Sequence, residues 1–348
     1  MIRPDFDRLT RYFVAIALTL TLITGLTACL ANPSKSASSQ NQTTQHTTLP
    51  EWVKSPPGDD TDNMYGIGEG YSLDGAKQSA LKDIAGKLAT HVKSETENRT
   101  YLQNNHLDST YKQRIKTQVK ETKLTSYEVL KTAQQAGQYY VIIAMSRAAF
   151  IKDKQNQLSQ ITSKIETELE NVEAKNKLIQ LVRFNNSIQL SNQARPLIYL
   201  ISAADPQANL QHYLDDYRQY EQKEKHLSEN TRFFLTSNPE FAPLATQIKK
   251  MLQTNGFQVT NRTSADSILE IQGTIAEQDI FSTKSVNINF NVLTKTKSGQ
   301  LIGDEAYQLY GSSVSNFETS RQLAFGKLVK KLSNKHGIYQ MLGLNKKK

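Results

Sequence analysis

The sequence predicts an α+β protein in which runs of helix and of antiparallel strand are segregated along the chain. A strand dotted with glycine precedes an alanine-rich amphipathic helix near residue 70, and a heptad pattern of apolar residues runs through the middle. Residues 286–292 alternate apolar and polar without a fault. We expect an N-terminal small antiparallel sheet with helices, a central long helical hairpin, and a C-terminal α/β sandwich with an antiparallel sheet.

Composition limits the class of protein. The chain has 348 residues, 38% of them hydrophobic and 22% charged, which suits about two domains of a water-facing protein. The net charge of +9 is scattered among acidic residues. It indicates either a solvated basic surface or attraction to phospholipid head groups, cell-wall polymers or nucleic acid. No nucleic-acid-binding motif is present, so we expect no nucleic-acid partner.

The first 28 residues look like a signal peptide. Arg3, Arg8 and Arg11 precede an apolar run over residues 13–26. That run is too short to span a bilayer, which takes about 20 residues, but it suits the core of a signal peptide, which takes about 7–15. The run ends in Leu-Thr-Ala-Cys, and Cys29 is the only cysteine of the chain. An uncleaved signal anchor, or an ordinary signal with a chance cysteine, is the alternative.

The residues Leu-Thr-Ala-Cys29 resemble the lipobox of bacterial lipoproteins. The resemblance implies that the Cys29 thiol carries diacylglycerol and that the chain is cut between Ala28 and Cys29. The new amine is then acylated, for example by palmitate. Two or three acyl chains suffice to anchor a protein stably in a membrane. In bacterial lipoproteins, an Asp directly after the lipid-bearing cysteine often retains the protein at the inner membrane. This chain has Leu30 at that position, so the resemblance implies a periplasm-facing anchor in the outer membrane. Residues 29–49 are mostly Ser, Gln, Asn and Thr and predict a flexible tether.

We expect the first folded domain over residues 50–147. A strand over 65–70 leads to a helix that begins after Ser72 or Asp74 as cap, with one apolar stripe formed by Ala76, Ala80, Leu81, Ile84, Leu88 and Val92. A helix over 111–119 and two strands near 126–131 and 138–145 follow. Tyr71 stands where a dinucleotide fingerprint needs glycine. The glycines of the strand therefore indicate close packing of the helix.

This domain resembles the LPP-twenty family of bacterial lipoproteins. The resemblance rests on Pro-Glu-Trp-Val at 50–53, Tyr-Gly-Ile-Gly-Glu-Gly at 65–70, the alanine-rich helix, and Tyr-Tyr-Val-Ile-Ile-Ala-Met-Ser-Arg-Ala-Ala-Phe at 139–150. It covers about residues 50–150 only. The family includes the flagellar assembly lipoprotein P, so the resemblance implies a role in the cell envelope that is flagellar in some members.

A helical hairpin is expected over residues 148–229. Apolar residues recur at seven-residue spacing through a segment of about 40 residues, at Ile151, Leu158, Ile165, Val172 and Ile179. Ala-Asp-Pro at 204–206 breaks the pattern before a second helix, which carries Tyr213, Tyr217 and Tyr220. The heptads indicate either packing within one chain or the seam of a homo-oligomer. The tyrosines indicate a packed stripe or, as the alternative, a binding surface.

The last domain is expected over residues 230–345. Its pattern predicts a strand at 232–236 and a helix that starts at Asn238-Pro239 and ends at Gly256. A short strand at 257–259 and three longer ones follow, over residues 269–275, 286–292 and 300–310, and an amphipathic helix comes last. An antiparallel sheet half-buried against two helices accounts for the pattern.

No motif for catalysis is present. The six histidines, at positions 46, 91, 106, 212, 226 and 336, show no metal-ligand spacing, and the Gly-x-Ser-x-Gly motif of hydrolases is absent. The adjacent Asp215 and Asp216 point different ways on a helix and suit a solvated face. We therefore expect no enzymatic activity, no cofactor and no metal.

These observations favour a non-catalytic scaffold or assembly factor, held at the outer membrane by lipid and in contact with envelope proteins. The alternative is a regulator or activator of a cell-wall or envelope enzyme that it reaches across the periplasm.

Overall fold

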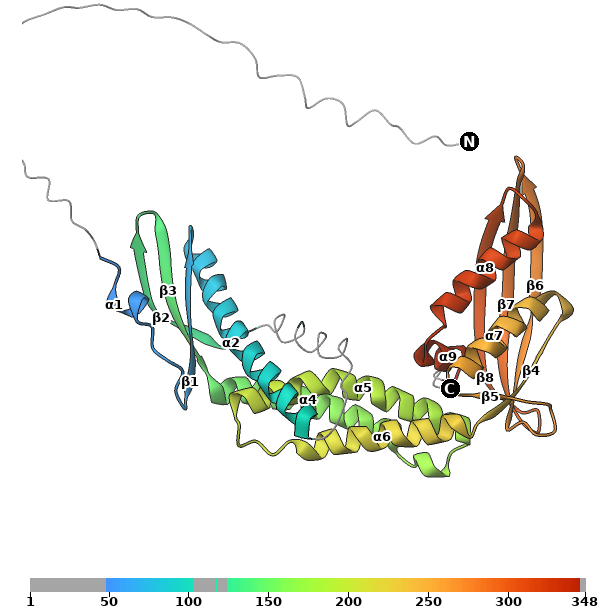
Figure 1. Cartoon of the computed structure of the whole chain (residues 1–348), viewed down its shortest axis with the longest axis horizontal. Helices are drawn as coiled ribbons and strands as arrows, with labels where there is room; N and C mark the ends of the chain where they lie inside the picture. Colours follow the sequence, from blue (N-terminus) through green and yellow to red (C-terminus); the bar gives the residue numbers. More distant parts are fainter. Residues whose placement is uncertain (1–47, 103–116, 118–123, 345–348) are drawn as a thin grey trace, which may run out of the picture. The chain divides into compact units, whose positions relative to one another are not determined.

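The computed structural model describes residues 48–102, residue 117 and residues 124–344 (Figure 1). The expected signal peptide, with Ala28 and Cys29, lies outside these residues. So does the expected tether apart from its last two positions. Of the helix expected over 111–119 only Thr117 is described, and it is helical. Among the described residues, no helix is long and apolar enough to cross a membrane. The α+β class is confirmed.

The first sheet has three antiparallel strands in the order β1-β3-β2. A short helix, α1 (Glu51–Lys54), precedes β1 (Asn63–Gly70), and α2 (Leu73–Leu102) follows it. The hairpin of β2 (Tyr127–Gln135) and β3 (Gln138–Ser146) turns at Ala136 and Gly137. Both turn residues have positive φ, as a two-residue type I′ hairpin turn requires. The expected strands and the expected helix after Ser72 are confirmed.

The glycines of β1 let α2 lie directly on the strand. A Cβ atom built on Gly68 would stand 2.2 Å from the backbone oxygen of Ala76 and 2.2 Å from the backbone nitrogen of Ala80. At Gly66 it would stand 2.2 Å from the oxygen of Ala80. Real side chains do not tolerate such distances to backbone. The interpretation of these glycines as close-packing positions is therefore confirmed.

The middle of the chain is helical, but the single helix expected over about 40 residues is wrong. Helix α4 (Arg147–Leu169) and helix α5 (Lys177–Ala204) are separate, and α6 (Gln211–Glu229) follows. The chain turns at Asn171, whose φ of 52° is left-handed. The side chain of Asn176 then caps α5 by accepting a hydrogen bond from the amide of Leu178, at 2.9 Å.

Helix α5 contributes to both hydrophobic cores. Its first turns bury Leu178, Leu181 and Val182 in the core of the C-terminal part. Its later turns, from Ala194 to Ala204, are buried in the core of the N-terminal part. The heptad residues Leu158, Ile165 and Val172 are buried within the single chain, as the intrachain interpretation expects.

The second sheet has five strands in the order β5-β4-β6-β7-β8. Its elements are β4 (Arg232–Ser237), the 3-10 turn η2 (Pro239–Phe241), α7 (Ala242–Thr254), β5 (Gln258–Val259), β6 (Ser267–Ile280), β7 (Thr283–Thr296), β8 (Leu301–Ser313), α8 (Phe317–Lys331) and α9 (Lys335–Met341). Helices α7 and α8 lie on one face (Figure 1), where Phe241 packs against Phe290 and Phe325.

This sheet is mixed, whereas a purely antiparallel one was expected. Strand β4 pairs in parallel with both β5 and β6, while β6, β7 and β8 form an antiparallel meander. Parallel neighbours need a crossover connection, and α7 supplies it after β4. Alternation of apolar and polar residues marks a strand but does not say whether its neighbour runs parallel or antiparallel. The sequence pattern therefore left the direction of β4 open.

Candidate functional site

A charged cleft of about 670 Å³ opens where the start of β1, helix α2 and the ends of α4 and α5 meet. These elements converge because the N-terminal sheet and the helical middle share one core. The cleft is lined by Asp59, Asp60, Thr61, Met64, Lys87, Leu88, His91, Arg147, Ala148, Ile151, Ala203, Ala204, Asp205 and Pro206.

Arg147 connects three elements at this cleft. Its Nε atom donates to the backbone oxygen of Asp60 at 2.7 Å, and its Nη1 atom donates to the backbone oxygen of Ala204 at 3.0 Å. Its Nη2 atom lies 3.7 Å from the carboxylate of Asp59. Ala204 is the last residue of α5, where carbonyl groups lack helical partners. The guanidinium therefore caps α5 and ties it to the loop before β1.

Lys87 and the loop carboxylates form a second network beside it. The Lys87 ammonium donates to the backbone oxygen of Tyr65 at 2.7 Å and lies 3.1 Å from the carboxylate of Asp83. The carboxylate of Asp60 accepts from the Tyr65 hydroxyl at 2.8 Å and from the amide of Asn63 at 2.7 Å. These hydrogen bonds hold the pKa of Asp60 below its usual range, and the bond from Tyr65 has the largest effect.

The charged groups of the cleft are held by other parts of the same chain. Arg147, Lys87 and Asp60 are engaged with partners of the chain itself, and Met64, Leu88 and Ile151 give the lining an apolar part. Thr61 contributes the hydroxyl group of the lining and His91 its imidazole. Across the described ranges, no group of three or more His, Cys, Asp or Glu side chains is placed to hold a metal ion.

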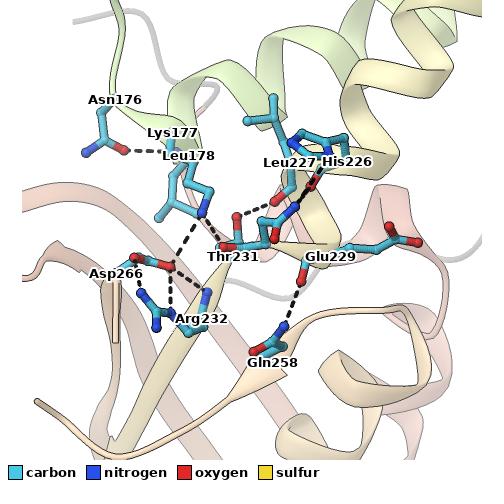
Figure 2. Close-up of polar contacts among 11 residues, drawn as sticks. Asn176, Lys177, Leu178, His226, Leu227, Glu229, Thr231, Arg232, Gln258 and Asp266 are labelled. Carbon is cyan, nitrogen blue, oxygen red and sulfur yellow. Dashed lines mark hydrogen bonds and ion pairs between the residues drawn. The ribbon is translucent and has the colours of Figure 1, made fainter. Parts of the chain in front are cut away.

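A polar network joins α5 and α6 to the C-terminal sheet (Figure 2). The Lys177 ammonium lies 3.6 Å from the carboxylate of Asp266 and donates to the backbone oxygen of Asn230. Asp266 also accepts from the backbone amide of Arg232 at 2.9 Å and forms an ion pair with its guanidinium at 3.3 Å. Burial raises the pKa of Asp266, but these hydrogen bonds and charges outweigh it and leave the pKa low.

A second buried network lies nearby. Glu224 of α6 is only 6% exposed, and its two oxygens accept from the Lys335 ammonium at 3.0 and 3.1 Å. The same ammonium lies 3.3 Å from the Ser228 hydroxyl. Tyr339 of α9 also donates to Glu224. A buried carboxylate with this many partners is structural, and it fixes α9 against α6.

The tip of the β6–β7 hairpin is apolar and exposed. Phe281 and Ser282 form its turn, with φ values of 45° and 65°, and Phe281 is 99% exposed. Val314, just beyond the end of β8, is 82% exposed, and Ile280 is 45% exposed. Both lie at the same end of the sheet, since Ile280 pairs with Thr283 and Ser313 pairs with Lys284. We call Ile280, Phe281 and Val314 the apolar tip.

The other residues singled out in the sequence have structural roles or lie outside the described residues. Ala28 and Cys29 are outside. Tyr217 is buried in the N-terminal core at 2% exposure, with Tyr213 and Tyr220 packed against that core, so the packed-stripe interpretation is confirmed. Sequence reasoning missed the cleft and the apolar tip. The one sequence signal for the tip is Ile-Phe-Ser at 280–282, where apolar residues stand at the turn between two alternating strands.

Two of the solved structures that are similar to parts of this chain illustrate the likeness. A secreted protein of Helicobacter pylori is 16% identical and covers 65% of this chain and 81% of its own, with a TM-score of 0.36. A minor lipoprotein of Acinetobacter baumannii is 16% identical and covers 32% of this chain and 92% of its own, with a TM-score of 0.27. No curated protein matches the sequence.

The family comparison gives a match over residues 50–146, to the LPP20 lipoprotein family. These bounds agree with the expected resemblance over about residues 50–150. The match supports a lipoprotein, and the helical middle and the C-terminal part lie outside it. Residues 50–146, called the LPP20 segment below, are therefore similar to the LPP20 lipoprotein family.

Proposed function

We propose that this lipoprotein is a non-catalytic scaffold or assembly factor, anchored by lipid in the outer membrane and facing the periplasm. The observation that supports it most is the apolar tip. A large apolar side chain at 99% exposure, on a backbone conformation that bulky residues avoid, is unfavourable in the free chain. Contact with an envelope protein removes the exposed apolar area.

The path of α5 also favours a scaffold. Because one helix supplies buried side chains to both cores, its two ends fold together with two different sets of elements. The networks around Asp266 and Glu224 add polar contacts to this connection. Such a chain is suited to present separate contact surfaces as parts of one protein.

Site-directed photo-crosslinking in growing cells tests the proposal. A benzophenone amino acid at position 281 should give a few discrete adducts with envelope proteins. The same group at Tyr71, which is 89% exposed in the LPP20 segment, serves as the control for exposure alone. Identical adducts at both positions, or none at position 281, contradict the scaffold proposal.

The anchor has an independent test. The Cys29→Ala variant should incorporate no labelled fatty acid and should accumulate as the uncut precursor. Density fractionation of the envelope should place the wild-type protein with the outer membrane. A variant that still carries label contradicts lipidation at Cys29, and wild-type protein in inner-membrane fractions contradicts the outer-membrane assignment.

A flagellar role is the narrower version of this proposal and rests on the resemblance alone. Loss of swimming in a deletion strain, restored by the wild-type gene, tests it.

A regulator of a cell-wall enzyme is the second candidate function. It is favoured by the open face of the C-terminal sheet, where Asn289 and Asn291 are exposed and uncharged. Stimulation of a purified cell-wall synthase by the purified chain tests this candidate, and unchanged turnover contradicts it.

A further inference from the structure

The open face of the C-terminal sheet carries a patch of carboxamide groups that the proposed scaffold role does not use. We propose that this patch binds an uncharged saccharide chain. The amide face consists of Gln272, Asn287, Asn289, Asn291, Gln308 and Tyr310. The inference goes beyond the proposed function and stands without it.

The register of three strands brings these residues together. Asn291 of β7 lies between Gln272 of β6 and Ala306 of β8, and Asn289 lies between Thr274 and Gln308. Asn287 pairs with Tyr310 in the same way. The residues that alternate with them, such as Ile288 and Phe290, are buried on the face that α7 and α8 cover. The amide face is therefore the side of the sheet opposite these helices.

The asparagines are an unusual choice for this position. Asparagine is depleted in strands, yet three alternate in β7, which has a neighbour on each side. No hydrogen bond joins the side chain of Asn287, Asn289, Asn291 or Gln308 to another residue that the structure describes. Places where a sequence departs from local preference without a structural gain are expected at functional sites.

The chemistry of these groups selects the ligand. A carboxamide offers two N–H donors and a carbonyl acceptor, and a sugar hydroxyl likewise donates and accepts. A shallow depression of about 390 Å³ runs across the three strands, and no charged side chain is among its described lining residues. Glu270 and Lys295, farther along the face, pair with each other. An ionic ligand thus finds no counter-charge in the depression, while a polyhydroxylated chain finds a partner at each amide.

Tyr310 adds an aromatic ring at one end of the face. It is 53% exposed, and its hydroxyl lies 3.1 Å from that of Ser285, which holds the ring in place. The exposed part of the ring offers an apolar surface to the C–H face of a sugar, while its polar tip stays hydrogen-bonded. An open sheet face with amides along it and a ring at its end offers contacts to several successive sugar units.

Titration of the purified full-length chain with cellotetraose and with chitotetraose, followed by NMR, tests the inference. Weak binding of at least one saccharide is expected. The double variant Asn289→Ala/Asn291→Ala should weaken it about tenfold. Gln134→Ala, which removes an exposed carboxamide from β2, is the matched control and should leave binding unchanged. No binding of either saccharide, or equal binding by the double variant, overturns the inference.

A second variant separates lost binding from lost folding. Threonine suits strands better than asparagine, so Asn289→Thr/Asn291→Thr should raise the melting temperature while it weakens saccharide binding. Retained binding in this variant overturns the inference. Self-association that the same substitutions abolish, seen by analytical ultracentrifugation, also overturns it, because the face then belongs to a second copy of the chain. Neither result bears on the adducts at position 281.

Discussion

The hydroxyl group of Tyr339 donates a hydrogen bond to the carboxylate of Glu224, 115 positions earlier in the chain. Burial first, and then the charge of Glu224, raise the pKa of Tyr339 above its ordinary value, so the phenol stays protonated and remains a donor. Lys335 binds the same carboxylate. Helix α9 is thereby tied to α6 through one buried charge.

Glu224→Ala should strongly destabilise the protein. Removal of the carboxylate leaves the buried Tyr339 hydroxyl without its acceptor and leaves the Lys335 ammonium with Ser228 alone. An unsatisfied buried donor costs about 1–3 kcal/mol. Urea denaturation followed by circular dichroism measures the loss. Glu224→Gln should lose less, since its carbonyl oxygen still accepts from Tyr339. Glu128→Ala, at an exposed strand position, should change stability by less than about 0.5 kcal/mol. Equal losses in all three variants would contradict the buried network.

Two glycine substitutions should have opposite effects on stability. In Gly68→Ala the new methyl group meets backbone atoms of α2 at 2.2 Å, so α2 must shift away from β1 at a cost of about 2 kcal/mol or more. Gly86 lies within α2 and has nothing within 4 Å of the position of a Cβ atom. Gly86→Ala should therefore gain about 0.5–1 kcal/mol from helix propensity. Thermal melting of both variants measures these effects. A Gly68→Ala protein as stable as the wild type would contradict the close packing of α2 on β1.

The sequence predicts best where a pattern is local. The alternation in β7, the apolar stripe of α2 and the Asn-Pro start near η2 all mark elements that the structure contains. The break between α4 and α5 was missed, because the heptad spacing continues from Ile165 to Val172 through the turn. Asn171, a residue that tolerates left-handed backbone, is the signal that marks the break.

The charged cleft lies beyond single-sequence reasoning for a different reason. Asp60, Lys87, Arg147 and Ala204 come from distant parts of the chain, and each alone looks like an ordinary surface residue or helix end. Their meeting depends on how α5 packs on the N-terminal sheet, which no local pattern encodes. The amide face depends on the register of three strands in the same way.

The network around Asp266 should make stability depend on pH. The pKa of Asp266 in the folded protein is below its usual value. Its contribution to the free energy of unfolding is therefore fully present above the unfolded-state pKa of about 3.9, and it is lost as the pH falls through the folded-state pKa. Asp266→Asn should lower stability by about 1 kcal/mol at pH 7, and the difference from wild type should shrink as the pH falls below ~4. Melting curves from pH 7 to pH 3 measure this.

Asp74 offers the comparison for that experiment. Its side chain is 91% exposed in an ion pair with Lys77, so Asp74→Asn should give a much smaller difference at pH 7. A constant gap between Asp266→Asn and wild type over the whole pH range would contradict the role of the ionised carboxylate.

Phe281→Asn should stabilise the free protein while it removes the proposed contact. The turn needs positive φ at both positions, which is unfavourable for a bulky residue by about 1–2 kcal/mol, whereas asparagine is preferred at the first position of such turns. Urea denaturation should therefore show a gain of about 1 kcal/mol. Tyr71→Asn, which replaces another exposed aromatic residue but one without positive φ, should show no gain.

The same substitution should weaken the proposed contact in cells. A benzophenone amino acid at Val314 in the Phe281→Asn background should give fewer adducts than in the wild type, because the partner has lost its main apolar contact. A destabilised Phe281→Asn protein, or unchanged adducts, would mean that Phe281 is retained for folding rather than for contact.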